Sequence, residues 1–144
     1  MNDAAWWAMN RVFAGHTLLY RASRGHLGHH LPGAPPMLLL DHVGARSEKR
    51  RTSPLGYVRD GDAYVLIASK GGEPKHPSWY HNLLAHPDTT IQVGSKRLPV
   101  HARVATREER ARVWPRAVET YGGYAGYQKR TDREIPLVML EPRA

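Results

Sequence analysis

Short β-type segments joined by tight turns are the feature that most constrains the fold of this chain. Asp60-Gly61 and Gly94-Ser95 are dipeptides typical of hairpin turns, because glycine readily takes the positive φ angle that such turns require. Strands are expected on both sides of each turn, at residues 53–59, 63–69, 89–93 and 97–105. A hairpin joins antiparallel strands, whereas parallel strands need a crossover of about a dozen residues or more. The pattern therefore argues against a Rossmann-type sheet and predicts an antiparallel one.

Helices and two further strands are expected around this sheet. Thr106 and Glu109 form a capping box at the start of one helix, and a second helix is expected at 78–85. Apolar runs predict the additional strands, at residues 37–43 and 135–140. A length of 144 residues fits one domain. We therefore expect a single α+β domain over residues 1–144, built around a barrel-like sheet with an N-terminal helix and inserted helices.

The N-terminal residues 1–21 are expected to form a helix. Trp6, Met9 and Phe13 recur at helical spacing, which predicts an amphipathic helix that closes one side of the core. A second interpretation is an interfacial helix, with tryptophan at the level of lipid headgroups and Arg11 near lipid phosphates. Polar residues interrupt the stretch too often for a membrane span or a signal peptide, so a cytoplasmic protein is expected.

Positive charge is the next feature, because Lys and Arg exceed Asp and Glu by 21 to 13, a formal charge of +8. Such an excess suits nucleic acid, an anionic membrane or a small polyanionic ligand. A concentrated share lies in the connector 44–51, in Arg46, Lys49, Arg50 and Arg51. Together with the Ser47 hydroxyl, these cations suit a phosphate or carboxylate tail, and a solvated turn without a ligand is the competing interpretation. Arginines elsewhere, at 107–116, are mixed with glutamates, so no nucleic-acid partner is expected.

Two further motifs could carry chemistry. Ser69-Lys70-Gly71-Gly72 ends a predicted core strand, where glycines permit close approach of a ligand and Ser69 and Lys70 supply a hydroxyl and a charge. It lacks the spacing of a Walker loop. Tyr121, Tyr124 and Tyr127 fall on one side of a helical turn. They either pack as core or line a flat aromatic pocket.

Other reactive groups are not indicated by the sequence. The chain has no cysteine, which removes thiolate nucleophiles and Cys-ligated metals. His26, His29 and His30 cluster in a loop rich in Gly and Pro without a carboxylate nearby, so no metal site is expected. No Ser-His-Asp order or carboxylate pair stands out. An enzyme of this composition would therefore depend on a bound cofactor.

The stretch from Leu66 to Asn82, LIASKGGEPKHPSWYHN, resembles the deazaflavin-dependent nitroreductases of actinobacteria. Further motifs of this family occur in its order, and the resemblance spans residues 18–142. It implies a split β-barrel of the FMN-binding type and coenzyme F-420, a deazaflavin with a phosphate and polyglutamate tail. It also implies hydride transfer from the reduced cofactor to a quinone, enone or nitroaromatic acceptor. A non-catalytic module that binds the cofactor or another anion is the alternative.

The resemblance also implies roles for individual residues. Tyr124 would orient the acceptor, with Ser69 opposite it, and these two residues are the catalytic candidates. The acceptor side would be lined by Tyr121, Tyr124 and Tyr127. The cofactor would be held by Arg46, Ser47, Lys49, Arg50, Arg51, Pro54, Ser69, Lys70 and Trp79. Some family members associate with membranes, which adds a peripheral contact through residues 1–20 at the inner face of the plasma membrane.

The basic turn departs from the family pattern T-G-[RK]-[RK]-[ST]-G at two positions. Ala45 stands where the family has a cation, and Glu48 stands where it has glycine. Glu48 brings a negative charge near an expected polyanion, and its Cβ lies at a position where a positive φ is expected. Lys49 and Arg50 could compensate for the charge but not for the backbone geometry. Tight cofactor binding therefore does not follow from the resemblance alone.

Overall fold

Six antiparallel strands form a closed barrel in the order β1-β2-β3-β6-β5-β4. The structure is a computed structural model that describes residues 3–25, 28–29, 35–72 and 75–143. The strands are β1 Met37–Val43, β2 Arg50–Asp60, β3 Ala63–Ile67, β4 Asp88–Val93, β5 Lys96–Val104 and β6 Leu137–Pro142. Both predicted hairpins are present, since β2 pairs with β3 and β4 pairs with β5. The predicted α+β barrel is confirmed.

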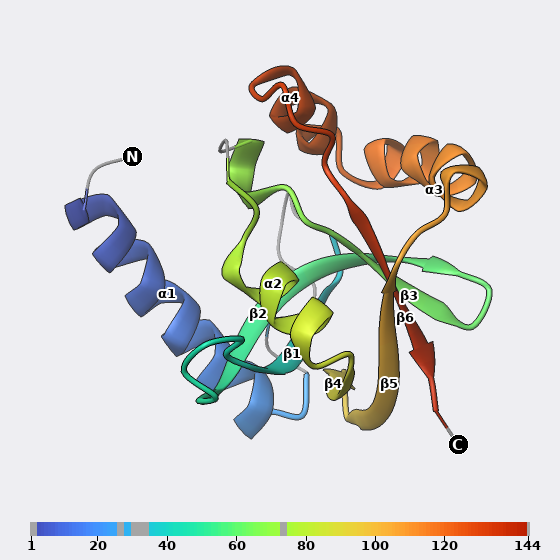
Figure 1. The fold of residues 1–144 in the computed structure, drawn as a ribbon. Coiled ribbons are helices and arrows are strands. Elements are labelled where there is room, and N and C mark those ends of the chain that lie inside the picture. Colours follow the sequence, from blue (N-terminus) through green and yellow to red (C-terminus); the bar gives the residue numbers. More distant parts are fainter. Residues whose placement is uncertain (1–2, 26–27, 30–34, 73–74, 144) are drawn as a thin grey trace.

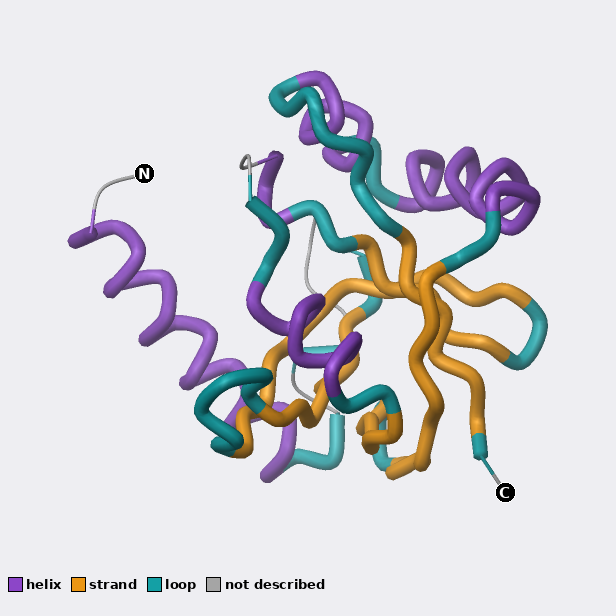
Figure 2. Tube along the Cα trace, viewed as in Figure 1, coloured by secondary structure: helices purple, strands orange, loops and turns teal. Residues whose placement is uncertain are grey.

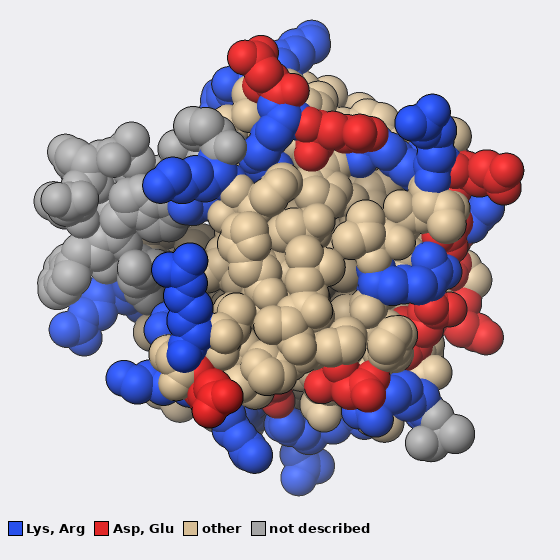
Figure 3. Space-filling view, viewed as in Figure 1, with Lys and Arg blue, Asp and Glu red and all other residues tan. Residues whose placement is uncertain are grey.

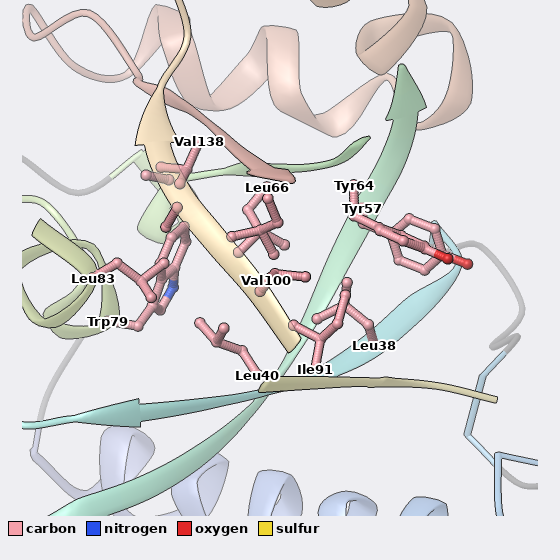
Figure 4. Packing of buried hydrophobic residues seen from close by; sticks show 13 residues of the cluster. Leu38, Leu40, Tyr57, Tyr64, Leu66, Trp79, Leu83, Ile91, Val100 and Val138 are labelled. Carbon is pink, nitrogen blue, oxygen red and sulfur yellow. The ribbon is translucent and has the colours of Figure 1, made fainter. Parts of the chain in front are cut away.

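The barrel interior is filled by alternate residues of each strand, as expected for a sheet with one buried face. Leu38 and Leu40 of β1 pack there with Val100 of β5. The helix α2 (Ser78–Ala85) closes one end, because its Trp79 and Leu83 side chains point into the same interior (Figure 4). The barrel and α2 therefore share one hydrophobic core.

A second cluster lies on the outer face of β3 and β6. Val65, Leu137 and Met139 pack there against α3 (Arg107–Thr120) and α4 (Gly123–Lys129), which lie on one side of the barrel (Figures 1 and 2). The predicted capping box starts α3, since Thr106 accepts from the Glu109 N–H and the Glu109 side chain accepts from the Thr106 N–H. The short 3-10 turn η1 (Lys70–Gly72) lies against α4.

The N-terminal helix α1 (Asp3–Ala22) forms as expected, but its position differs from the prediction. It extends away from the barrel (Figure 1), and its Phe13 and Leu18 side chains are 41% and 71% exposed. Its C-terminal end is anchored, where the buried Tyr20 hydroxyl accepts from the Gly94 N–H and donates to the Met37 carbonyl. The interpretation of a helix that closes one side of the core is therefore wrong for the described side chains, because the six strands already close the barrel. The Trp6 side chain lies outside the described residues.

The start of β2 and the end of β3 differ from the predicted bounds, and this places predicted site residues in other elements than expected. β2 begins at Arg50, so Arg50 and Arg51 lie in the strand and not in a connector, because they continue the ladder opposite Val43 and His42. β3 ends at Ile67, so Ser69 lies beyond the ladder. None of the described helices is long and apolar enough to cross a bilayer.

Candidate functional site

The basic turn between β1 and β2 is closed by its own backbone. The Gly44 N–H donates to the Lys49 carbonyl at 2.9 Å, and the Glu48 N–H donates to the Gly44 carbonyl at 3.0 Å. Glu48 has a φ of +57°, as expected from the glycine that the family pattern places there. The side chains of Arg46 and Lys49 are exposed. The turn therefore presents exposed cations on a hydrogen-bonded backbone, with one strained residue among them.

A buried polar network that the sequence analysis missed supports this turn. The Asn82 amide nitrogen lies 2.9 Å from His42 Nδ1, and its oxygen accepts the Ala45 N–H at 2.9 Å. His42 Nε2 lies 2.9 Å from the Ser53 hydroxyl. Because the amide donates to Nδ1, the imidazole carries its proton on Nε2. Desolvation and the nearby Arg51 charge lower the pKa of His42 to about 4, so the ring is neutral at pH 7.

The network fixes the start of the turn to α2, although its members are far apart in sequence. The detectable signal was His42 itself, a polar residue at an inward position of the apolar strand β1. A buried polar side chain in such a place requires hydrogen-bond partners, and Asn82 and Ser53 are the partners of His42.

A basic hollow lies beside the turn, with a volume of about 570 Å³. Its cations come from α1, β2 and β5, and they are Arg21, Arg50, Arg51 and Arg97. Asp41 is the one carboxylate among the described lining residues, and it is bound at 3.1 Å by both Arg21 and Arg97. The four arginines outnumber this carboxylate, and an excess of positive charge in a hollow raises the local concentration of anions. Arg21 and Arg97 were not among the predicted site residues.

The segment after β3 has an unusual backbone. Ser69 is buried, and Lys70 follows it with a φ of +46°, a conformation that non-glycine residues rarely adopt. Gly72 has a φ of +82°, and a Cβ there would lie 2.7 Å from the Tyr127 carbonyl oxygen. The segment therefore lies directly against α4. Strained residues that persist in a fold commonly occur at functional sites.

The three predicted tyrosines form one cluster at α4. Ring centroids are 5.0 Å apart for Tyr121 and Tyr124, and the hydroxyls of Tyr121 and Tyr127 are 3.0 Å apart. Tyr124 is only 6% exposed and belongs to the outer hydrophobic cluster, whereas the other two rings are half-buried. Burial raises the pKa of the Tyr124 hydroxyl, so it stays protonated at neutral pH. Tyr124 thus packs as core, with Tyr121 and Tyr127 partly buried against the same cluster, and the aromatic pocket stays a prediction.

Some predicted residues lie apart from these groups. Trp79 is 7% exposed and packs inside the barrel, and Pro54 is half-buried in β2 opposite Leu39. Their roles toward the cofactor stay predictions. Among the described residues, no group of three or more His, Cys, Asp or Glu could hold a metal ion. His26 and His30 lie outside the described residues, and His29 lies 2.9 Å from the Tyr20 hydroxyl.

The surface around α2 suits a ligand with an apolar ring and an anionic tail. Figure 3 shows a largely uncharged area over α2, with Lys and Arg side chains on its left and lower sides. The basic turn and hollow offer cations for phosphate and carboxylates. The strained backbone at Lys70 marks where a flat ring could meet the main chain, whereas Gly72 is already packed against Tyr127 of α4. The residues present therefore fit a deazaflavin with a polyanionic tail.

Comparison with known proteins gives the family. Residues 12–142 match the model of a family described as F420H(2)-dependent quinone reductase. The chain belongs to this family. It is therefore a reductase that uses coenzyme F-420. An F420H(2)-dependent quinone reductase of Mycobacterium tuberculosis is 48% identical over 131 residues, which cover 89% of this chain and 88% of that protein.

Solved structures agree with this assignment. The F420-H2-dependent reductase FDR-A is 48% identical, with a TM-score of 0.68 over 74% of this chain and 94% of that chain. A structure described as a domain-swapped dimer is 40% identical, with a TM-score of 0.70 over 96% of this chain and all of that chain. The heme storage protein HutZ of Vibrio cholerae, at 17% identity and a TM-score of 0.57, shares the fold alone.

Proposed function

We propose that this reductase transfers a hydride from reduced coenzyme F-420 to an electron-poor acceptor, with a quinone as the leading class and enones and nitroaromatic compounds as further ones. The observation that carries the proposal is the contact of η1 with α4, where Gly72 meets the Tyr127 backbone. It brings the expected cofactor segment and the expected acceptor segment side by side. A hydride moves directly between the two reactants, so their binding surfaces must adjoin.

In this proposal the basic turn and hollow bind the tail of the cofactor. The residues assigned to the tail are Arg46, Ser47, Lys49, Arg50, Arg51 and Pro54, with Ser69, Lys70 and Trp79 assigned to the deazaflavin. The bound cofactor supplies the hydride. The protein supplies binding, orientation and exclusion of water. Ser69 and Lys70 orient the cofactor, because they lie on a backbone that cannot adjust freely.

On the acceptor side, Tyr121, Tyr124 and Tyr127 line the surface in the proposal. Tyr124 donates a hydrogen bond to the oxygen of the acceptor, where negative charge develops as the hydride arrives. Its raised pKa keeps the hydroxyl protonated for that purpose. The bond between the Tyr121 and Tyr127 hydroxyls holds the other two rings in place.

Fluorescence titration with oxidised and reduced coenzyme F-420 tests the proposal, followed by turnover with a quinone, an enone and a nitroaromatic compound. Binding and reduction of at least one acceptor are expected. Arg46→Ala should weaken cofactor binding more at low salt than at high salt, because exposed charges are screened. No binding at tens of micromolar cofactor would overturn the proposed function, and an unchanged dissociation constant would remove Arg46 from the tail site.

A second candidate is a module that binds the cofactor or another anion without catalysis. The observation that favours it is the turn itself, where Ala45 lacks a charge and Glu48 adds a negative one at a strained position. Saturable cofactor binding without reduction of any acceptor in the panel would support this candidate. Reduction of one acceptor at saturating cofactor would reject it.

We also propose that the protein works in the cytoplasm and that residues 1–20 touch an anionic lipid surface at the inner face of the plasma membrane. Val12 and Leu19 are exposed apolar side chains on one face of α1, and the exposed Arg11 suits lipid phosphates. Sedimentation with vesicles containing anionic lipid should retain the full chain and not a chain that lacks residues 1–15. Equal retention of both chains would contradict the lipid contact. So would a full chain that does not bind lipid and has twice the monomer mass in solution, because α1 would then serve a dimer interface.

A further inference from the structure

Arg133 lies between α4 and β6 in the sequence, and its guanidinium donates hydrogen bonds to the backbone carbonyls just before Lys70. Nη2 donates to the Ser69 carbonyl at 2.7 Å, and Nη1 donates to the Ala68 carbonyl at 3.2 Å. Nη1 also donates to His76 Nδ1 at 3.0 Å. Hydrogen bonds from a charged donor are stronger than neutral ones, and the guanidinium is rigid and planar. Two successive carbonyls are thus held by one side chain that is distant in sequence.

The backbone of Arg133 is tied to α4 by a single side chain. The Gln128 amide nitrogen donates to the Arg133 carbonyl at 2.8 Å, and its oxygen accepts the Ile135 N–H at 2.9 Å. Gln128 follows Tyr127 directly in the helix that carries the tyrosines. The chain of contacts therefore runs from α4 through Gln128 and Arg133 to Ser69.

The same contacts explain how Lys70 keeps its unfavourable backbone conformation. Lys70 has a φ of +46°, which is unfavourable for a residue with a Cβ, so neighbouring interactions must hold the segment. Arg133 fixes the two peptide groups before Lys70, and the contact of Gly72 with Tyr127 fixes the segment after it. Arg133 therefore contributes to holding Lys70 in this conformation.

We propose that Arg133 is a positioning residue that holds Ser69 and Lys70 against the cofactor and couples them to the acceptor helix α4. The proposal rests on the function proposed above for what this segment binds. Arg133 acts through the backbone of its neighbours, so its removal should disturb both cofactor binding and the rate of hydride transfer at saturation. A residue needed only for folding would change stability without this pair of effects.

Arg143 provides a matched control within the same chain. It also donates to backbone carbonyls, those of Val100 at 3.1 Å and Thr89 at 3.4 Å, but these lie on strands remote from Ser69. Arg143→Ala thus removes an arginine with the same kind of contacts and leaves the contacts of Ser69 and Lys70 unchanged. Because Thr89 lines the basic hollow, a small change in tail binding is the most that this variant should cause. Arg133→Lys keeps the charge but cannot reproduce the planar fork.

The experiment compares the unaltered chain with Arg133→Ala, Arg133→Lys and Arg143→Ala. Fluorescence titration gives the dissociation constant of coenzyme F-420, and single-turnover reduction of a soluble quinone at saturation gives the transfer rate. We expect Arg133→Ala to weaken binding and to slow transfer by about tenfold each, because small errors of position are costly for transfer. The binding and rate of Arg133→Lys should lie between those of Arg133→Ala and the unaltered chain. Arg143→Ala should stay within about twofold of the unaltered chain in both quantities. Added guanidinium should partly restore the rate and binding of Arg133→Ala.

Hydrogen exchange of the protein without cofactor supplies an independent readout. In Arg133→Ala, amides of 69–72 and of 123–129 should lose protection together, whereas Arg143→Ala should leave both unchanged. Wild-type-like binding, rate and exchange in Arg133→Ala would overturn the inference, and so would equal losses in Arg143→Ala. If the unaltered chain failed to bind the cofactor, the proposed function would fall, and exchange alone would still decide whether Arg133 couples the two segments.

Discussion

The basic turn at 44–49 and the segment at 69–72 each contain a non-glycine residue in the left-handed region, but they hold it differently. Glu48 lies in an exposed turn closed by two backbone hydrogen bonds. Lys70 lies beside a buried serine, between the Arg133 guanidinium and the backbone of α4. The first segment is an exposed turn closed mainly by its own backbone, whereas the second segment is held from several sides by other elements.

This difference separates two tasks that an anionic redox cofactor imposes on a protein. Exposed cations attract a charged tail over a distance and do not need exact placement. Hydride transfer depends on short distances and aligned groups, which a fixed backbone can provide. The comparison predicts that changes near Lys70 have large effects and changes near Glu48 have small ones.

The largest effect is expected for Gly72→Ala. The new Cβ would meet the Tyr127 carbonyl at a backbone φ of +82°, so η1 or α4 must move. We expect a loss of about 3 kcal/mol in stability together with most of the transfer activity. Gly61→Ala is the control, since Gly61 also has a positive φ but its Cβ would meet nothing within 4 Å. It should lose about 1 kcal/mol, and equal losses by denaturant unfolding would refute the role of the contact.

Acidification should destabilise the network of His42, Asn82 and Ser53 beneath the basic turn. The pKa of His42 is depressed to about 4 in the folded chain, so the unfolded chain binds more protons as the pH falls below about 6.5. Stability should therefore be complete above that pH and decline by roughly 3 kcal/mol as the pH falls to about 4. His76, whose pKa is also lowered by burial, acts in the same direction.

The variant His42→Gln isolates this contribution, because its amide can hydrogen-bond but does not titrate in this range. Unfolding by urea between pH 7 and 4 should show a smaller decline in the variant than in the unaltered chain. Parallel curves would assign the acid sensitivity to other groups.

Tyr124→Phe should reduce turnover by about tenfold, the value of one hydrogen bond to developing charge, with little change in cofactor affinity. The measurement is a steady-state rate with a quinone and with a nitroaromatic acceptor. Tyr121→Phe is the comparison variant, since the Tyr121 hydroxyl bonds to Tyr127. Unchanged turnover of Tyr124→Phe with both acceptors would remove its hydroxyl from the proposed mechanism.

The smallest effect is expected at the turn itself. Glu48→Gly should stabilise the chain by about 0.5–1 kcal/mol, because glycine takes the positive φ without steric strain. It should also tighten cofactor binding at low salt, since a negative charge leaves the turn. Glu48→Gln separates the two causes, as it removes the charge and keeps the Cβ. A gain in thermal stability from Glu48→Gln as large as that from Glu48→Gly would exclude the backbone explanation.

Much of the fold followed from local signals in the sequence. The bounds of β1 and α2 agree with the predicted segments 37–43 and 78–85, and the capping box at Thr106 forms as expected. The expected positive φ at Glu48 is present as well. Such signals operate within a few residues, so they can be recognised without knowledge of the fold.

The site was predicted only in its separate parts. Ser69, Lys70 and the tyrosine motif were named as candidates, but Arg133, which donates to the Ser69 carbonyl, was not. Arg133 is 64 residues from Ser69 in the sequence, and Asn82 is 40 residues from His42. Contacts over such separations leave no periodic pattern in the chain.

By itself, the sequence determined the antiparallel strands, their hairpins and the strained turn, because turn chemistry and side-chain alternation depend on near neighbours. Tertiary structure alone decided that α1 extends away from the barrel, since the closed ladder of β1 to β6 leaves no edge for it to cover. It also decided that η1 meets α4 and that Arg133 binds the carbonyls before Lys70. These contacts arise when the pairing of β3 with β6 brings distant segments together.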